Sequence, residues 1–424
     1  MKNYKILIVG YDFEQKIHRG ITFYGKALIK SLKEIGNEIY LLTSGEFSEE
    51  EYIYLLNIIR QLDSPNYLDK KGKLLFFIKN LIKKRQDIIE NKFIFQDSKL
   101  NYLNHVKYFY NIPYFYDLTT VHNRFFLKKP MDLNIENKAV DLIITTSPMN
   151  IKTDVPLMQT LHDVIPLSCR FHPPMDDSKI FYYRVKNMLR YSYKILSVSE
   201  YSKQECLKIF PSFEDKIEVV HQPIPVYEDE KLLAEEEIVQ ESILNKFNLK
   251  KDNFLFYVGM LEKRKNIKGM IEAFLGVYDK IKIPLVFAGG LGYGQEEFIN
   301  YLKDTKLKKK IKYLGYINNI EKLVLLKNSR AFLFPSFNEG FGLPPLEAML
   351  MGTNVLTSNT SALPEVCGDA ALLINPFNIK ELADGIIEIT LNERLRENLK
   401  LNHKKQIEKF SYENFQNKIS RVIS

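Results

Sequence analysis

The amino-acid sequence predicts an α/β protein built from two doubly wound domains. Short apolar runs that end in turns recur along the chain, and stretches with helical periodicity separate them. Both halves open on the same strand–loop–helix plan, at Lys5–Gly10 and at Phe254–Gly259. A chain of 424 residues is long enough for two to three domains, and 45% hydrophobic with 26% charged residues is typical of a soluble globular protein.

The N-terminal half begins with a buried strand at Lys5–Gly10 (KILIVG), followed by a helix over Thr22–Ile35. Gly36 ends that helix, because glycine adopts the left-handed conformation of a helix C-terminus without strain. Residues 45–135 show no clear pattern. We expect further strands at Glu38–Thr43, Asp141–Thr146, Pro156–Leu161, Lys194–Ser199 and Lys216–Val220, and a helix at Lys203–Phe210 that Ser199 or Ser202 caps.

Gly20 and His162 are the candidate site residues of this half. Gly20 lies at the N-terminus of the first helix, where free backbone N–H groups favour a phosphate. His162 and Asp163 directly follow the strand Pro156–Leu161, and ligands of open α/β sheets bind beyond the carboxyl ends of strands. The pair predicts an imidazole that faces a substrate while a neighbour places its proton. A structural histidine that caps the loop is the alternative.

The C-terminal half repeats the plan after a proline-containing, acidic segment at residues 221–237, whose composition indicates a linker. The strand Phe254–Gly259 leads through the loop MLEKRKN into a helix over Ile267–Tyr278. We expect further strands at Ile283–Gly290, Ile311–Gly315, Ala331–Phe334, Thr353–Ser358 and Ala371–Ile374, with helices at Ile320–Lys327, from Ser361, from Ile379 and over Ser411–Ile423.

The stretch Phe332–Gly352 (FLFPSFNEGFGLPPLEAMLMG) holds two carboxylates in a strand–glycine turn–helix arrangement. Such a helix N-terminus presents free N–H groups to an anion. Glu339 lies at the strand end and Glu347 about one turn into the helix, so the two carboxylates can reach different parts of one extended polar ligand. A purely structural helix start does not need this pair.

Three consecutive cations, Lys263, Arg264 and Lys265, precede the helix at Ile267. Cations at a helix N-terminus oppose the helix dipole, at a cost of roughly a few tenths of a kcal/mol each. An anionic ligand would offset that cost, and the position at the carboxyl end of a strand favours an anion site over ordinary solvated side chains.

The formal charge of +8 is compatible with nucleic acid, an anionic membrane or phosphorylated ligands. The sequence lacks zinc-ligand spacing and a recognisable RNA-binding motif, so we expect no nucleic-acid partner. The basic, apolar segment Lys73–Gln86 suits an anionic membrane surface, although a lid helix with solvated lysines is the favoured alternative. We expect no metal site, transmembrane helix or signal peptide, and therefore a cytoplasmic protein, peripheral to the inner membrane face if this segment binds lipid.

These features together fit a nucleoside diphosphate sugar in a cleft between the two domains. Arg264, Lys265 and the amides of the glycine turn suit phosphates. Glu347 suits the vicinal hydroxyls of a ribose, and Glu339 suits the hydroxyls of a sugar or a developing positive charge.

The chain resembles the retaining glycosyltransferases of the GT-B type, in family 4, also called group 1. The block from Glu339 to Glu347 matches the E-x7-E motif of that family. The resemblance covers most of the chain except residues 45–135, and LHDVIPL resembles the mannosyltransferase branch. The other matching segments are YVGMLEKRKNI, KYLGYI, SALPEVCGDAALLINP and KILSVSEYSKQE.

The resemblance implies a metal-independent α-glycosyltransferase without a cofactor, whose donor is a nucleoside diphosphate sugar, GDP-mannose being favoured. The acceptor would be a glycan or a lipid-linked glycan of cell-surface polysaccharide synthesis. Residues 1–223 would bind the acceptor, residues 224–408 the donor, and residues 409–424 would form a helix that crosses back onto the first domain. In their implied roles, His162 and Glu339 face the transferred sugar and are catalytic, and the donor-binding residues are Gly20, Arg264, Lys265, Tyr316, Ile317, Gly340, Phe341, Gly342, Leu343 and Glu347.

Met260 departs from the family, which usually has an arginine there as one of two diphosphate-binding cations. Arg264 is the candidate replacement. A non-catalytic GT-B subunit that stabilises a partner enzyme, and an epimerase or phosphorylase on the same fold, are the alternative functions. The presence of Glu339, Glu347 and Lys265 favours a catalytic protein.

Overall fold

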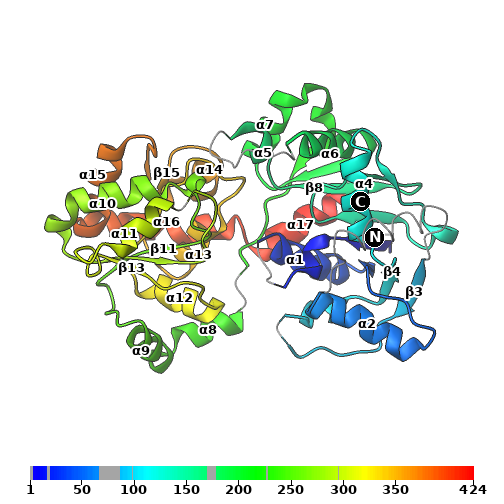
Figure 1. Ribbon diagram of the computed structural model, residues 1–424, viewed down its shortest axis with the longest axis horizontal. Helices are drawn as coiled ribbons and strands as arrows, with labels where there is room; N and C mark the ends of the chain where they lie inside the picture. The colour runs from blue at the N-terminus through cyan, green and yellow to red at the C-terminus, as the bar shows by residue number, and fades with distance from the viewer. Residues whose placement is uncertain are drawn as a thin grey trace.

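The computed structural model describes residues 3–16, 20–65, 86–97, 99–169, 178–225, 228–294 and 296–424. Figure 1 shows two lobes side by side, each with a sheet covered by helices. The predicted α/β architecture of two doubly wound domains is therefore confirmed. Of the basic segment Lys73–Gln86, all but Gln86 lies outside the described residues.

The N-terminal sheet has eight strands within the described residues, in the order β10-β9-β8-β6-β1-β2-β4-β3. Every neighbouring pair is parallel except β3 and β4. The strands are β1 (Lys5–Val9), β2 (Glu38–Thr43), β3 (Asp87–Glu90), β4 (Tyr108–Asn111), β6 (Leu142–Thr145), β8 (Leu157–Leu161), β9 (Lys194–Ser197) and β10 (Ile217–Val219), and β5 (Met131–Asp132) pairs separately with β7 (Ile151–Lys152).

The C-terminal sheet has the order β13-β12-β11-β14-β15-β16, and all its described pairs are parallel. Its strands are β11 (Leu255–Val258), β12 (Leu285–Ala288), β13 (Ile311–Tyr313), β14 (Ala331–Phe334), β15 (Val355–Ser358) and β16 (Ala371–Ile374). Strand order reverses between β11 and β14, and in the N-terminal sheet between β1 and β6. Open α/β sheets bind ligands at such switch points, so the fold marks two places for a site.

Helices cover both sheets and occupy nearly all of the predicted positions. The described α-helices are α1 (Gly20–Glu34), α2 (Glu51–Asp63), α4 (Phe115–Phe125), α5 (Ile165–Ser168), α6 (Ser178–Tyr191), α7 (Glu200–Ile209), α8 (Glu228–Glu235), α9 (Glu237–Lys246), α10 (Ile267–Ile281), α11 (Glu296–Lys303), α12 (Asn319–Asn328), α13 (Leu343–Leu350), α14 (Leu363–Cys367), α15 (Ile379–Leu391), α16 (Glu393–Glu408) and α17 (Tyr412–Ile423). The 3-10 helices are η1 (Tyr11–Glu14), η2 (Asn101–His105), η3 (Glu136–Lys138), η4 (Pro211–Lys216), η5 (Lys263–Lys265) and η6 (Gly368–Ala370).

The acidic part of the expected linker is helical, which corrects the sequence interpretation of residues 221–237. Glu228, Asp229 and Glu230 form the first turn of α8, where carboxylates are stabilised by the helix dipole. Ala234 on the same helix is fully buried in the C-terminal core. The extended connection between the domains is correspondingly shorter than the composition indicated.

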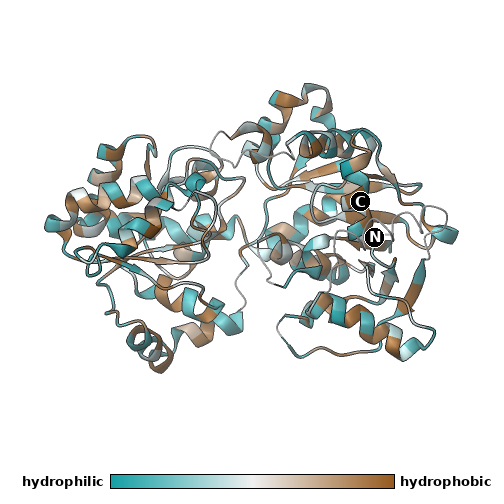
Figure 2. Ribbon diagram, in the orientation of Figure 1, coloured by the Kyte–Doolittle hydropathy of each residue, from teal (hydrophilic) through white to brown (hydrophobic). Residues whose placement is uncertain are grey.

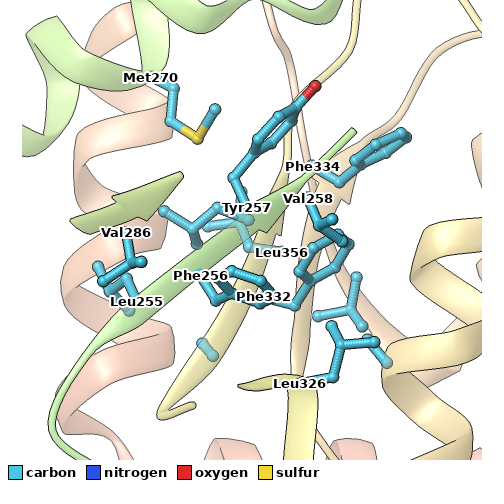
Figure 3. Packing of buried hydrophobic residues seen from close by; sticks show 14 of the residues in the cluster. Leu255, Phe256, Tyr257, Val258, Met270, Val286, Leu326, Phe332, Phe334 and Leu356 are labelled. Atoms are coloured by element: carbon cyan, nitrogen blue, oxygen red, sulfur yellow. The ribbon is translucent and has the colours of Figure 1, made fainter. Parts of the chain in front are cut away.

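The core of each domain lies between its sheet and its helices. Figure 2 shows hydrophobic strands in the middle of both lobes and largely hydrophilic outer helix faces. In the C-terminal core, Tyr257 and Phe334 stack at the carboxyl ends of β11 and β14, with ring centroids 6.0 Å apart (Figure 3). This rigid aromatic layer lies directly beneath the loops of the C-terminal switch point.

The last helix, α17, belongs in space to the N-terminal lobe. Figure 1 shows it in red beside the blue α1, although α16 lies in the other lobe. Phe415, Ile419 and Val422 of α17 are buried in the N-terminal core together with Leu28 and Leu32 of α1. The chain therefore crosses between the domains twice, which restricts how they can move against each other.

Candidate functional site

The loops after β11 and β14 bring Lys265, Arg264 and Glu339 together at the C-terminal switch point. The Lys265 Nζ lies 2.5 Å from Glu339 Oε1, and Arg264 Nη1 lies 3.0 Å from Glu339 Oε2. Arg264 also pairs with Glu262 at 2.5 Å and donates to the carbonyl of Asn338 at 2.5 Å. Two residues that are 74 positions apart in sequence, Lys265 and Glu339, thus form one buried ion cluster.

Glu339, the carboxylate of the cluster, is ionised at neutral pH. Burial works to raise the pKa of Glu339, but Arg264 and Lys265 outweigh it and hold the pKa at about 2. The Lys265 ammonium also lies 4.7 Å from the centre of the Phe334 ring, a favourable cation–π contact. Burial lowers the pKa of Lys265, and the charge of Glu339 offsets part of that shift. The ion pairs of this cluster are buried, where charge interactions are strong.

Glu347, the second carboxylate of the motif, is buried and is bound by a residue that the sequence interpretation missed. Lys322 of α12 places its Nζ 2.7 Å from Glu347 Oε1. The pair fixes the orientation of the Glu347 carboxylate. Because Lys322 and Glu347 lie 25 positions apart, on different helices, no local pattern could have connected them.

The glycine turn leads into the N-terminus of α13, which begins at Leu343. Gly342 has a φ of 118°, a conformation that L side chains rarely adopt, so this turn requires glycine. Across the interface, α1 begins at Gly20, and a Cβ at Gly20 would lie 3.6 Å from Leu343 Cδ1. Two helix N-termini therefore meet between the domains, which suits an anion.

The remaining predicted donor-binding residues, Phe341, Tyr316 and Ile317, differ in how accessible they are to a ligand. Phe341 is buried and packs edge-on against Phe410, which precedes α17. Tyr316 and Ile317 follow β13, two strands away from β11. Tyr316 is 72% exposed and Ile317 is buried, so the exposed ring and not the isoleucine is available to a ligand at this edge.

The N-terminal switch point holds a cavity of about 390 Å³. Tyr11 and Asp12 follow β1, and Ser147 follows β6, so the strand ends on either side of the order reversal supply its walls. Asp12 accepts hydrogen bonds from the hydroxyls of Thr146 and Ser147 at 3.3 and 3.4 Å. Asp12 was missed in the sequence, although it follows a strand as His162 does.

His162 lies in the same cavity, and a backbone carbonyl sets its tautomer. Its Nε2 is 2.7 Å from the carbonyl of Thr146, and since a carbonyl can only accept, Nε2 carries the proton. The neighbour that places the proton is therefore Thr146 and not Asp163, whose Oδ1 accepts from the amide of Ile165. Burial lowers the pKa of His162 and raises that of Asp12, so the imidazole is neutral at pH 7.

Direct contacts join the two half-sites at Gly340. Its carbonyl accepts hydrogen bonds from Ser199 Oγ at 2.6 Å and Ser202 Oγ at 3.0 Å, both from the N-terminal domain. A Cβ at Gly340 would lie only 2.5 Å from the carbonyl oxygen of His162. The turn that follows Glu339 therefore touches the backbone of His162, and the absence of a side chain permits it.

Glu365 of α14 holds the domains together at a second point. It accepts hydrogen bonds from the amides of Glu200 and Tyr201, at the N-terminus of α7, at 2.8 and 3.1 Å. His221, two residues after β10, places Nε2 2.7 Å from the same carboxylate. A carboxylate of one domain thus caps a helix of the other.

Among the described residues, no cluster of three or more His, Cys, Asp or Glu side chains could hold a metal ion. The same part of the chain contains no helix that is both long and apolar enough to cross a membrane.

Comparison with known proteins finds similarity to glycosyltransferases. Residues 239–406 match the family described as glycosyl transferases group 1. The chain is 30% identical to an O-antigen chain mannosyltransferase B of Escherichia coli, over 60% of this chain and 66% of that protein. It is 32% identical to the serotype-specific mannosyltransferase WbdA of the same species, over 41% of this chain. The chain thus spans less than two thirds of the first and only 22% of the second.

A solved structure with the same fold is that of Anabaena Alr3699/HepE in complex with UDP-glucose. It aligns over 99% of both chains with a TM-score of 0.62 and 14% sequence identity. At this identity the likeness establishes the fold, which is GT-B.

Proposed function

We propose that this chain, a GT-B protein with a group 1 glycosyltransferase domain and a likeness to bacterial mannosyltransferases, transfers a sugar from a nucleoside diphosphate sugar to a glycan or lipid-linked acceptor. We favour mannose as the sugar, GDP-mannose as the donor and cell-surface polysaccharide synthesis as the setting. The likeness to O-antigen mannosyltransferases supports these choices. A lipid-linked acceptor would bring the reaction to the inner membrane face, where the basic segment Lys73–Gln86 would meet anionic lipid.

One observation carries the proposal: the switch points of the two sheets meet at the contact between Gly340 and His162. One switch point holds charges that suit a diphosphate, and the other holds a cavity next to a neutral imidazole. A transferase that joins two substrates needs two such sites facing each other, because positioning both reactants removes much of the entropic barrier.

The C-terminal half-site suits the donor. Lys265 and the N-termini of α1 and α13 would bind the diphosphate, and Glu347, held by Lys322, would accept hydrogen bonds from the ribose hydroxyls. As the bond between the sugar and the phosphate breaks, negative charge grows on the leaving diphosphate. Stabilisation of that charge by fixed cations and dipoles lowers the barrier.

The N-terminal cavity suits an acceptor with an uncharged sugar at its end. Its walls combine aromatic rings, Tyr11 and Tyr116 among them, with hydroxyl and amide groups, and the charged side chains of Asp12, Asp163 and Arg184 also line it. This mixture binds hydroxyls better than it binds phosphate. We propose a retaining reaction, in which the acceptor hydroxyl attacks from the face that the diphosphate leaves and gives its proton to the donor phosphate.

The test is donor binding by wild type and Lys265→Ala, read by calorimetry with GDP, UDP and their sugars and without added metal. Loss of a charge-assisted contact should weaken binding by about 1.5–3 kcal/mol. Conversion of mannose-terminated acceptors by wild type completes the test. Absence of donor binding by folded wild type, or an unchanged dissociation constant in Lys265→Ala, would contradict the proposal and favour a non-catalytic subunit.

A further inference from the structure

We propose that the donor-binding domain carries a second carbohydrate site, which binds an uncharged stretch of glycan away from the reacting groups. The site is a cavity of about 520 Å³ between the start of α10, the start of α11 and the loop before α15. Its size lies within the range of about 300–1,000 Å³ that is usual for small-molecule sites.

Aromatic side chains form one wall of this cavity. Phe337 and Phe377 stack with ring centroids 4.9 Å apart and an angle of 24° between the rings. Phe377 is 52% exposed and Tyr293 is 49% exposed, and the neighbouring Ile379 is also exposed. A cluster of exposed apolar groups around a cavity marks a binding surface in soluble proteins. The C–H faces of a pyranose ring pack on such exposed aromatic rings.

Polar groups complete the lining without a net charge. The ammonium groups of Lys263 and Lys268 are balanced by the carboxylates of Glu272 and Glu296. Lys268 and Glu272 also lie 3.9 Å apart as an ion pair along α10. Balanced charges disfavour a phosphate or another anion, whereas carboxylates and ammonium groups bind sugar hydroxyls. The cavity therefore fits a neutral glycan.

This cavity is distinct from both half-sites of the proposed reaction, yet one loop connects it to the donor side. Lys263 lines the cavity, whereas Lys265, two residues later, points to Glu339. The amide of Phe337 donates to the carbonyl of Arg264 at 2.9 Å. A glycan held here would stay near the enzyme between transfers, which raises the effective concentration of its growing end.

The experiment titrates neutral mannose, glucose and galactose oligosaccharides into the full-length protein and follows saturation-transfer NMR signals. All titrations use the Tyr11→Ala variant, which should weaken glycan binding in the acceptor cavity. The remaining glycan binding then reports on the second site. In that background, Phe377→Ala and, separately, Tyr293→Ala should weaken glycan binding about tenfold, since truncated aromatic anchors commonly cost this much. Leu401→Ala is the matched control, because Leu401 is an exposed apolar residue on α16 and does not line this cavity.

The proposal is overturned if no oligosaccharide binds at about 10 mM, or if both aromatic variants bind as tightly as the Leu401→Ala control. A thermal-unfolding scan of each variant shows whether its fold is intact. If the loss of Phe377 disturbs the loop, the Tyr293→Ala variant alone tests the proposal. Donor binding is measured on the same samples. Its absence would refute the proposed function, on which the Tyr11→Ala background and the choice of mannose oligomers rest, and would leave the glycan titration of the Phe377 and Tyr293 variants valid.

Discussion

Replacement of Gly340 by alanine should separate donor binding from sugar transfer. The φ of Gly340 is not among the positive values of the chain, so alanine can adopt its backbone conformation. Within its own domain the new methyl group brings no backbone strain. Across the interface, however, it would lie 2.5 Å from the carbonyl oxygen of His162 and 2.7 Å from Asp163 Cβ, closer than such atoms approach in proteins.

The size of the effect follows from the contacts at that point. Relief of the overlap requires the domains to move apart, which breaks the hydrogen bonds from Ser199 and Ser202 to the Gly340 carbonyl. Two lost hydrogen bonds are worth about 1 kcal/mol each, and an inserted methyl group costs about 1–3 kcal/mol. A shift of about 3 kcal/mol against the closed arrangement lowers the ratio of closed to open molecules roughly a hundredfold.

The assay measures kcat for transfer beside the donor dissociation constant, with small-angle scattering to follow the separation of the domains. We expect kcat to fall by up to roughly a hundredfold and donor affinity to fall by less, because α1 is the one proposed diphosphate contact that belongs to the N-terminal domain. Gly276→Ala is the matched control, because a Cβ there meets nothing within 4 Å, and it should leave both quantities unchanged. Full transfer activity in Gly340→Ala, or an equal loss of donor affinity, would refute the assignment of the closed interface as the reactive state.

Two further predictions concern buried carboxylates. Lys322→Met should lower the free energy of unfolding by about 3 kcal/mol, because Glu347 is left buried without its cation. Adding Glu347→Gln should restore this stability but not donor affinity. Denaturant titrations in which the double variant is as unstable as the single variant would speak against this. Burial raises the pKa of Glu14 to about 7, so the folded protein binds this proton more tightly and loses stability as pH rises from about 4.5 to 7. Glu14→Gln should remove about 3 kcal/mol of that loss, and identical stability curves for variant and wild type from pH 5 to 8 would exclude the effect.

The fold was predictable because its strands are short and apolar on both faces. The predicted strands Glu38–Thr43, Ala331–Phe334 and Ala371–Ile374 agree with β2, β14 and β16 at both ends. Parallel strands that are covered by helices on both sides need continuous apolar runs, and such runs are visible in the sequence. The helix α8 was missed because its first turn is acidic, and only its packing on the C-terminal core distinguishes it from a linker.

The sequence predicted the site residues that follow strands. It did not predict those that reach the site only through packing between distant elements. His162, Lys265 and Glu339 each lie in the segment between a strand and the α-helix that follows it. Asp12 does as well, and the same rule applied to the first strand would have found it. Lys322 lies on an ordinary helix, and nothing in its neighbours shows that it faces Glu347.

The contacts around Glu339 assign different tasks to the two cations of the donor loop. Arg264 is held by Glu262, by the carbonyl of Asn338 and by Glu339 itself, and burial together with these carboxylates leaves it fixed in the wall of the site. For Lys265, the described contacts are with Glu339 and the face of Phe334. A phosphate that competes with Glu339 can therefore recruit Lys265 by a small movement of its flexible side chain, whereas Arg264 would have to break three contacts.

The fixed guanidinium of Arg264 could therefore act on Glu339 without binding phosphate. In the proposed reaction, Lys265 would turn to the donor and Arg264 would remain to keep Glu339 ionised, so that its carboxylate could accept hydrogen bonds from the transferred sugar or stabilise positive charge on it. On this account Arg264 does not replace the cation missing at Met260. If the chain binds a nucleoside diphosphate sugar as proposed, the positive ends of α1 and α13, which meet at Gly20 and Leu343, would supply the remaining stabilisation of the diphosphate.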